Sequence, residues 1–257
     1  MLTPPEIARS LLAVGESKAR LPFGKMLLLA ILAGAYIALA GVGATAAAVT
    51  VESGSLAKLL SACVFPAGLS MVILAGSELF TGNCLMVMAL LERRITPALL
   101  LRNWLTVYLG NAVGGAAVAA LAVYSHTASL FGDGLARSMV SIAESKAALG
   151  FGDAFLRGVL CNFLVCLAVW MAAASKRAEG KVIALFFPIL LFVLCGYEHC
   201  IANLYYLPAG AFAAAEYGME TTLTLAGCLK NLAAVTLGNL VGGAALGVGY
   251  RFAYLKE

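Results

Sequence analysis

Long apolar runs dominate the pattern of hydrophobic and polar positions along this chain. A bilayer-spanning helix needs roughly 20 apolar residues, and six regions meet that length: residues 26–50, 59–91, 103–124, 154–174, 182–212 and 225–250. The mean hydropathy of +0.96 and a charged fraction of 12% lie outside the range of soluble domains. We therefore predict an all-α integral membrane protein with six transmembrane helices.

Two polar motifs interrupt this pattern, in the second and fifth regions. Residues 76–83 read GSELFTGN and residues 196–203 read GYEHCIAN. A continuous helix over 59–91 would be about 50 Å long, whereas the hydrocarbon core is roughly 30 Å thick. We expect both helices to break at these motifs, where Gly76 and Gly82 supply flexibility in the first. Irregular backbone at this depth is tolerated only inside protein or along a cavity, so the two loops are predicted to meet and line one.

The two halves of the chain repeat each other. Both motifs fit G-x-E-x-x-x-x-N, and residues 102–117 (RNWLTVYLGNAVGGAA) match residues 230–245 (KNLAAVTLGNLVGGAA). Each half holds three spans, and an odd number reverses the direction of the second half. The pattern predicts two inverted three-helix repeats, which are used to build pathways through membranes. Duplication without a transport role is the alternative, and the buried polar motifs argue against it.

The repeated polar residues have structural explanations. Glu78 and Glu198 are expected to accept hydrogen bonds from free N–H groups of the broken loops, with proton transfer as the alternative role. Asn83 and Asn203 are predicted to hold the other loop ends by bonding backbone groups. We assign two further asparagines to interhelical hydrogen bonds, and glycines at i, i+4 spacing to close helix contacts: Asn111, Asn239, Gly110, Gly114, Gly238 and Gly242.

The ends and the charges set the predicted organisation. Thr3, Pro4, Pro5 and Glu6 begin an amphipathic helix that is expected to lie on the membrane surface. Twelve of the 17 Lys and Arg residues would be cytoplasmic if both termini are, which the positive-inside rule favours; the net charge of +4 mostly reflects this topology, and no nucleic-acid partner is expected. The predicted parts are a cytoplasmic amphipathic helix, a first repeat, an extracytoplasmic connection, a second repeat and a cytoplasmic tail: residues 1–25, 26–124, 125–153, 154–250 and 251–257.

One position distinguishes the two motifs, since Leu79 in the first corresponds to His199 in the second. A histidine in a break at the bilayer centre can be a hydrogen-bond donor, a cation or a proton donor to a weak-acid anion. His126, in a predicted outer loop, is expected to be solvated. The seven cysteines form no C-x-x-C pair and are interpreted as small buried hydrophobes, so neither a metal site nor a cofactor is expected.

Three segments resemble the signature regions of the formate/nitrite transporter family. They are AGSELFTGN (75–83), RGVLCNFLVCLAVWMA (157–172) and GYEHCIANLYYLP (196–208), and the resemblance extends over essentially the whole chain. It implies a homopentamer of aquaporin-like protomers in the cytoplasmic (inner) membrane. Each protomer would pass a small monovalent anion such as formate, nitrite or hydrosulfide, with proton coupling left open.

The resemblance also implies roles for individual residues. His199 would be the central histidine of the pathway, Thr81 the loop threonine that faces it, Asn162 a pore asparagine, and Lys146 a basic residue that attracts anions near the outer mouth. Hydrophobic constrictions on either side of the histidine would be formed by Phe65, Leu69, Leu79 and Phe192. A bare anion loses its hydration in such a ring, whereas a neutral acid loses far less.

Two other classes of function fit less well. A membrane enzyme could pair His199 with Glu198 or Glu78, but the sequence offers no nucleophile, metal cluster or cofactor site. A neutral-solute facilitator would share the broken helices, but the paired Asn-Pro-Ala loops of that class are absent. Formate is the leading substrate; Cys200 and Cys84 depart from the small hydroxyl residue or threonine expected in formate members and slightly favour hydrosulfide.

Overall fold

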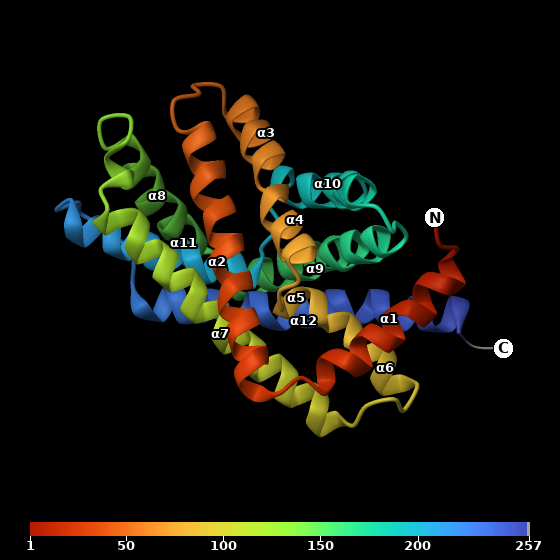
Figure 1. Ribbon diagram of the computed structural model, residues 1–257. Coiled ribbons are helices and arrows are strands. Elements are labelled where there is room, and N and C mark those ends of the chain that lie inside the picture. Colours follow the sequence, from red (N-terminus) through yellow and green to blue (C-terminus); the bar gives the residue numbers. More distant parts are fainter. Residues whose placement is uncertain (256–257) are drawn as a thin grey trace.

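The computed structural model describes residues 1–255, and every regular element in them is helical (Figure 1). The elements are α1 (Pro4–Ala19), α2 (Phe23–Ala48), α3 (Gly54–Val64), α4 (Pro66–Ala75), α5 (Phe80–Asn83), η1 (Cys84–Met86), α6 (Val87–Leu91), α7 (Pro97–Tyr124), η2 (Thr127–Ser129), α8 (Gly134–Ala148), α9 (Phe151–Ala173), α10 (Ala178–Leu194), α11 (Cys200–Glu216) and α12 (Leu225–Tyr254). The fold class is therefore all-α, as predicted.

Within the described residues, five helical stretches are long and apolar enough to cross a bilayer: Phe23–Ala48, Gly54–Ala75, Pro97–Tyr124, Phe151–Ala173 and Leu225–Tyr254. The fifth region predicted from the sequence, 182–212, is divided between α10 and α11, which have 17 residues each. The final helix, α12, continues to Tyr254. Most of the predicted tail 251–257 is thus helix, and residues 256 and 257 lie outside the described part.

Both predicted interruptions are present. The chain leaves α4 at Gly76, which has a left-handed backbone (φ 80°), and enters α5 at Phe80. It leaves α10 near Gly196 (φ 69°) and enters α11 at Cys200. Glycine adopts positive φ without steric cost, which explains why it stands at both exits. Gly82 has no such role, because it lies within the short helix α5, so its predicted contribution to the break is wrong.

Glycines bring two helix pairs into close contact. A Cβ atom at Gly110 or Gly114 of α7 would collide with Ala30 or the Ile31 carbonyl of α2, and one at Gly242 of α12 would collide with the Val159 carbonyl of α9. The contacts α2–α7 and α9–α12 are the most extensive in the fold. The predicted use of these glycines for close helix packing is confirmed.

The N-terminal helix, α1, packs one face on protein, and the expectation that it lies on the membrane surface stays a prediction. Its buried face, which includes Ile7 and Leu12, contacts α6, η1, α7, α9 and α12. Val14 of the same helix is exposed. The predicted start at Thr3 is correct: the Thr3 N–H donates to Glu6 at 2.7 Å, and this bond lowers the pKa of the Glu6 carboxyl.

Candidate functional site

The two interruptions meet through a buried pair, His199 and Thr81. The Thr81 Oγ1 lies 2.9 Å from His199 Nε2, and both residues are buried. The Ala202 N–H donates to His199 Nδ1 at 3.1 Å, so that nitrogen carries a lone pair and no proton. The neutral ring therefore has its hydrogen on Nε2 and donates to the Thr81 hydroxyl. A charged imidazolium would have to give up the bond from Ala202.

Two asparagines hold the interrupted backbone. The Asn239 amide donates to the carbonyls of Glu198 (2.9 Å) and Gly158 (2.8 Å), and its oxygen accepts from the Cys200 N–H at 2.8 Å. In the first half Asn111 does the same for the carbonyls of Glu78 and Ala30 and the N–H of Phe80. The predicted interhelical bonds are confirmed, and these side chains also supply the loop bonds that were assigned to glutamate.

The glutamates instead form two equivalent ion-pair clusters. Glu78 accepts from Lys18 Nζ at 2.9 Å and from the Asn83 amide at 2.7 Å. The counterparts in the second half are Glu198, Lys146 (2.9 and 3.0 Å) and Asn203 (2.7 Å). In each cluster the asparagine donates to a second asparagine, Asn103 or Asn231.

This arrangement corrects two predictions from the sequence. Glu78 and Glu198 stabilise the loops, but their carboxylates bond side chains and not free loop N–H groups. Asn83 and Asn203 bond the glutamate on the other side of the break, and not backbone groups. A buried carboxylate needs a paired cation and hydrogen-bond donors, and each cluster supplies both.

Asn162 is placed differently from its predicted role. Both hydrogens of its amide are donated to carbonyls, to Thr81 at 3.2 Å and to Asn239 at 2.7 Å. The residue has no exposed surface and is absent from the linings of the cavities described below. It ties α9 to the first interrupted segment at Thr81 and to α12 at Asn239, and thus acts on the site from behind.

Three cavities lie in series along the two interruptions. The α1 vestibule has a volume of about 350 Å³ and is lined by residues of α1 together with Leu69, Glu78, Leu79 and Lys181. The α8 vestibule, about 370 Å³, is lined by residues of α8 together with Phe65, Phe192, Glu198 and His199. Between them lies a central cavity of about 10 Å³, which is room for about one water molecule.

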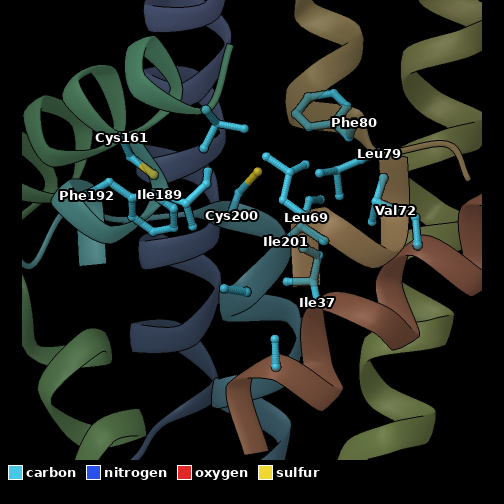
Figure 2. Close-up of a cluster of buried hydrophobic side chains, with 14 of the residues drawn as sticks. Ile37, Leu69, Val72, Leu79, Phe80, Cys161, Ile189, Phe192, Cys200 and Ile201 are labelled. Atoms are coloured by element: carbon cyan, nitrogen blue, oxygen red, sulfur yellow. The ribbon is translucent and has the colours of Figure 1, made fainter. Parts of the chain in front are cut away.

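The predicted constriction residues form the boundaries between these cavities. Leu69 and Leu79 line both the α1 vestibule and the central cavity, whereas Phe65 and Phe192 line both the central cavity and the α8 vestibule. The rings of Phe65 and Phe192 meet edge to face at 5.7 Å. Figure 2 shows Leu69 and Leu79 side by side across the cluster from Phe192. The sequence analysis missed three other lining residues, Ile37, Val165 and Ile189.

Lys18 is the main charged residue that sequence reasoning missed. The signal was present: residues 7–24 (IARSLLAVGESKARLPFG) match residues 135–152 (LARSMVSIAESKAALGFG) at an offset of 128 residues. Lys18 thereby corresponds to Lys146, and α1 to α8. The segment 125–153 was predicted as a connection, but it contains the 15-residue helix α8, and Lys146 lies in the last turn of that helix.

The burial of His126 and of the seven cysteines can be compared with their predicted environments. His126 is exposed, as expected. Cys84, Cys161, Cys166 and Cys200 are fully buried among apolar side chains, which confirms their interpretation as packing residues. Cys63, Cys195 and Cys228 are exposed or half-buried, so that interpretation is wrong for them.

Comparison with known proteins places the chain in a family. Residues 5–253 match the family described as formate/nitrite transporter. The probable formate transporter of Methanothermobacter thermautotrophicus is 38% identical over 99% of this chain and 98% of its own, and the formate channel FocA of Haemophilus influenzae is 39% identical over 86% and 83%. A solved pentameric formate channel with formate bound superposes with a TM-score of 0.80 at 33% identity, over 91% of this chain and 98% of that one.

All regular elements in residues 1–255 are helical, five stretches there are long and apolar enough to span a bilayer, and cavities lie in series between them. These features are those of a membrane transport protein. The matched relatives are channels and transporters, and this protein is likewise not an enzyme. The chain belongs to the formate/nitrite transporter family.

Proposed function

We propose that this protein is a channel that passes a small monovalent weak-acid anion, formate in the first place, across the cytoplasmic membrane. The observation that carries the proposal is the row of three cavities, in which the polar pair His199 and Thr81 stands between apolar constrictions. The relatives named as formate transporter and formate channels support formate as the substrate.

The central cavity favours a neutral species over an ion. Apart from His199 its lining is apolar, consisting of Ile37, Phe65, Leu69, Leu79, Val165, Ile189 and Phe192. An anion that enters it must give up its hydrating water. The protonated acid loses far less hydration free energy, because it carries no charge. His199, neutral and donating from Nε2, can transfer its hydrogen bond from Thr81 to the carboxyl group of the solute. Proton uptake from water in a vestibule would then accompany passage.

The transmembrane arrangement in this proposal is six spans in two inverted three-helix repeats, with an aquaporin-like protomer and both termini cytoplasmic. The matched bonding of Asn111 and Asn239, and of the two ion-pair clusters, supports the repeat. The excess of Lys and Arg on the proposed cytoplasmic side supports the orientation. On this view the α1 vestibule opens to the cytoplasm and the α8 vestibule to the outside.

A homopentamer is the proposed assembly. The similar formate channel is described as pentameric, and apolar side chains are exposed along the outer helices, among them Leu105, Leu109, Phe187 and Leu237. Such surfaces are suited to contact with neighbouring protomers and with lipid hydrocarbon.

Nitrite and hydrosulfide remain alternative substrates in this family. Cys200 and Cys84, however, line none of the three cavities and so give hydrosulfide no support.

Flux of labelled formate into proteoliposomes tests the proposal. Vesicles with the protein are expected to take up formate faster than empty vesicles, with a rate that rises as the pH falls. Nitrite, hydrosulfide and a neutral solute such as glycerol are compared under the same conditions. If no weak-acid anion crosses faster than in empty vesicles, the proposed function is wrong; flux of glycerol alone would indicate a neutral-solute facilitator.

A further inference from the structure

The α8 vestibule carries more positive charge than its ion pair balances. Its charged lining residues are Lys58, Lys146, Arg157 and Glu198. Both carboxylate oxygens of Glu198 accept from Lys146 Nζ, and one also accepts from Asn203. Three cations and one carboxylate therefore line the cavity, and the carboxylate is committed to one of the cations.

Lys58 and Arg157 are the cations in excess. Within residues 1–255 neither side chain forms an ion pair, and both are exposed. Lys58 lies within electrostatic range of Lys146, Glu198 and Arg157, but Glu198 is already paired with Lys146. An unpaired cation that faces a water-filled hollow leaves its field available to a passing anion, whereas the field of a paired cation is largely offset.

The comparison of the two halves separates these residues from the scaffold. The lysine–glutamate ion pair occurs in both halves, in Lys18–Glu78 and in Lys146–Glu198. By contrast, Arg157 corresponds to Leu29 at the 128-residue offset, and Lys58 corresponds to Ala178 at the 120-residue offset. The ion pairs thus belong to the architecture that both halves share, whereas neither Lys58 nor Arg157 has a cation at the corresponding position of the other half.

We propose that Lys58 and Arg157 form an anion-capture site in the α8 vestibule, which binds small monovalent carboxylates before they reach His199. Lys146, which the family resemblance gave this role, is a scaffold residue that neutralises Glu198. The inference rests on the proposed function, since it names the groups that collect its substrate. On the opposite side Lys181, which corresponds to Ser61 at the 120-residue offset, lines the α1 vestibule and forms no ion pair within the described residues.

The vestibule also has a positively charged approach. A further hollow of about 540 Å³ shares Thr45, Ser61 and Ser141 with it and has Arg137 as its one charged lining residue among those described. An anion would meet one cation there and two more in the vestibule. Charges of one sign in a cleft raise the local concentration of counter-ions by tenfold or more at low salt.

The test uses the substitutions Lys58→Gln, Arg157→Gln and their combination, with formate as the probe. Initial rates are measured against formate concentration in right-side-out and inside-out membrane vesicles, at about 0.01 M and 1 M salt, where the Debye length is about 30 Å and 3 Å. Lys230→Gln is the matched control, because it removes an exposed cation near the α8 end that lines none of the cavities. Lys181→Gln is the reciprocal variant.

For entry from the α8 side, the double variant is expected to need about ten times more formate for half-maximal flux at low salt. Its maximal rate should be unchanged, and the difference should shrink to within about twofold at high salt. Lys181→Gln should act only on entry from the α1 side, and Lys230→Gln on neither. Circular dichroism and gel filtration report whether the variants fold and assemble.

The two levels of proposal fail in different ways. If the unaltered protein moves no weak-acid anion, the proposed function is wrong. If it moves formate, but the double variant saturates at the same concentration with the same salt dependence, Lys58 and Arg157 are not the capture site. An equal loss at both salt concentrations, or an equal loss with Lys230→Gln, also overturns the inference.

Discussion

The substitution Asn239→Leu removes the side chain that connects the His199 loop to two helices. Asn239 has no exposed surface and makes three hydrogen bonds of 2.8–2.9 Å, to Cys200, Glu198 and Gly158. Leucine has nearly the same volume and no polar atoms. The Cys200 N–H, at the start of α11, has no partner within that helix. Without the Asn239 amide, this N–H and the Glu198 carbonyl each lose a hydrogen bond.

The size of the effect follows from these two groups. A buried polar group left without a partner costs about 1–3 kcal/mol, so the two together predict a loss of about 2–6 kcal/mol. The third partner, the Gly158 carbonyl, lies inside α9 and keeps its helical hydrogen bond. For a protein of this size 1 kcal/mol corresponds to about 2–4 °C, and we expect the unfolding midpoint to fall by about 5–20 °C.

Thermal unfolding of the detergent-solubilised protein measures this fall. Asn111→Leu is the matched variant, because Asn111 makes the equivalent bonds to the Phe80 N–H and the Glu78 and Ala30 carbonyls. It should lower the midpoint by a similar amount. Val241→Ala, on the exposed face of α12, should change the free energy of unfolding by less than about 0.5 kcal/mol.

The result for Asn239→Leu can refute this reasoning directly. A midpoint within 1–2 °C of the unaltered protein, a span of about 0.5 kcal/mol, would mean that the loop does not depend on these hydrogen bonds. A large fall for Asn239→Leu with none for Asn111→Leu would mean that the two halves are not stabilised in the same way.

Three further substitutions, the last with a matched control, test the site and its packing. His199→Ala should lower formate flux at acid and neutral pH while the protein still assembles, because the hydrogen bond from Nε2 to the solute is lost; flux equal to that of the unaltered protein at both pH values would make the histidine a scaffold residue. Phe192→Ala removes one ring of the aromatic pair at 5.7 Å and should admit larger carboxylates such as acetate and lactate, and unchanged selectivity in the same flux assay would count against the constriction. Gly242→Ala should destabilise the protein by about 1–3 kcal/mol, because the added Cβ collides with the Val159 carbonyl. Gly249→Ala on the same helix has open space around it and should be neutral or stabilising by up to about 1 kcal/mol; equal unfolding midpoints for the two glycine variants would contradict the packing argument.

The length of the apolar runs predicted the main features of the fold. The region 59–91 was too long for one helix, and the structure interrupts it at Gly76, where the left-handed backbone requires glycine. The difference between the motifs that introduces a titratable side chain, Leu79 against His199, marked the residue that meets Thr81. These predictions succeeded because they depend on bilayer thickness and on backbone sterics, which act locally along the chain.

The hydrogen-bond partners could not be predicted in the same way. Glu78 bonds Lys18, which lies 60 residues away in sequence, and only packing of α1 against the protein brings the two together. The helix α8 was overlooked for a related reason. A search for apolar runs recognises spans, and α8 carries Arg137, Glu144 and Lys146, so its charged sequence was interpreted as a loop.

The two ion-pair clusters recur in both halves, although the helices that carry them differ. The lysine and the glutamate of a cluster are 60 residues apart in the first half (Lys18 and Glu78) and 52 apart in the second (Lys146 and Glu198). The two asparagines of a cluster are 20 and 28 residues apart. After the break the first half passes through η1 and ends α6 at Leu91, but the second half continues as α11 to Glu216. Different connections thus bring the same four side-chain types together, although Lys18 bonds Glu78 and Asn83 whereas Lys146 bonds both oxygens of Glu198. A carboxylate placed beside an interrupted helix must be matched by a cation, and each half obtains it from a helix outside its apolar spans, α1 or α8. The loop that presents His199 is therefore held from the α8 side. The charge of Lys146 is neutralised by Glu198, the residue next to His199.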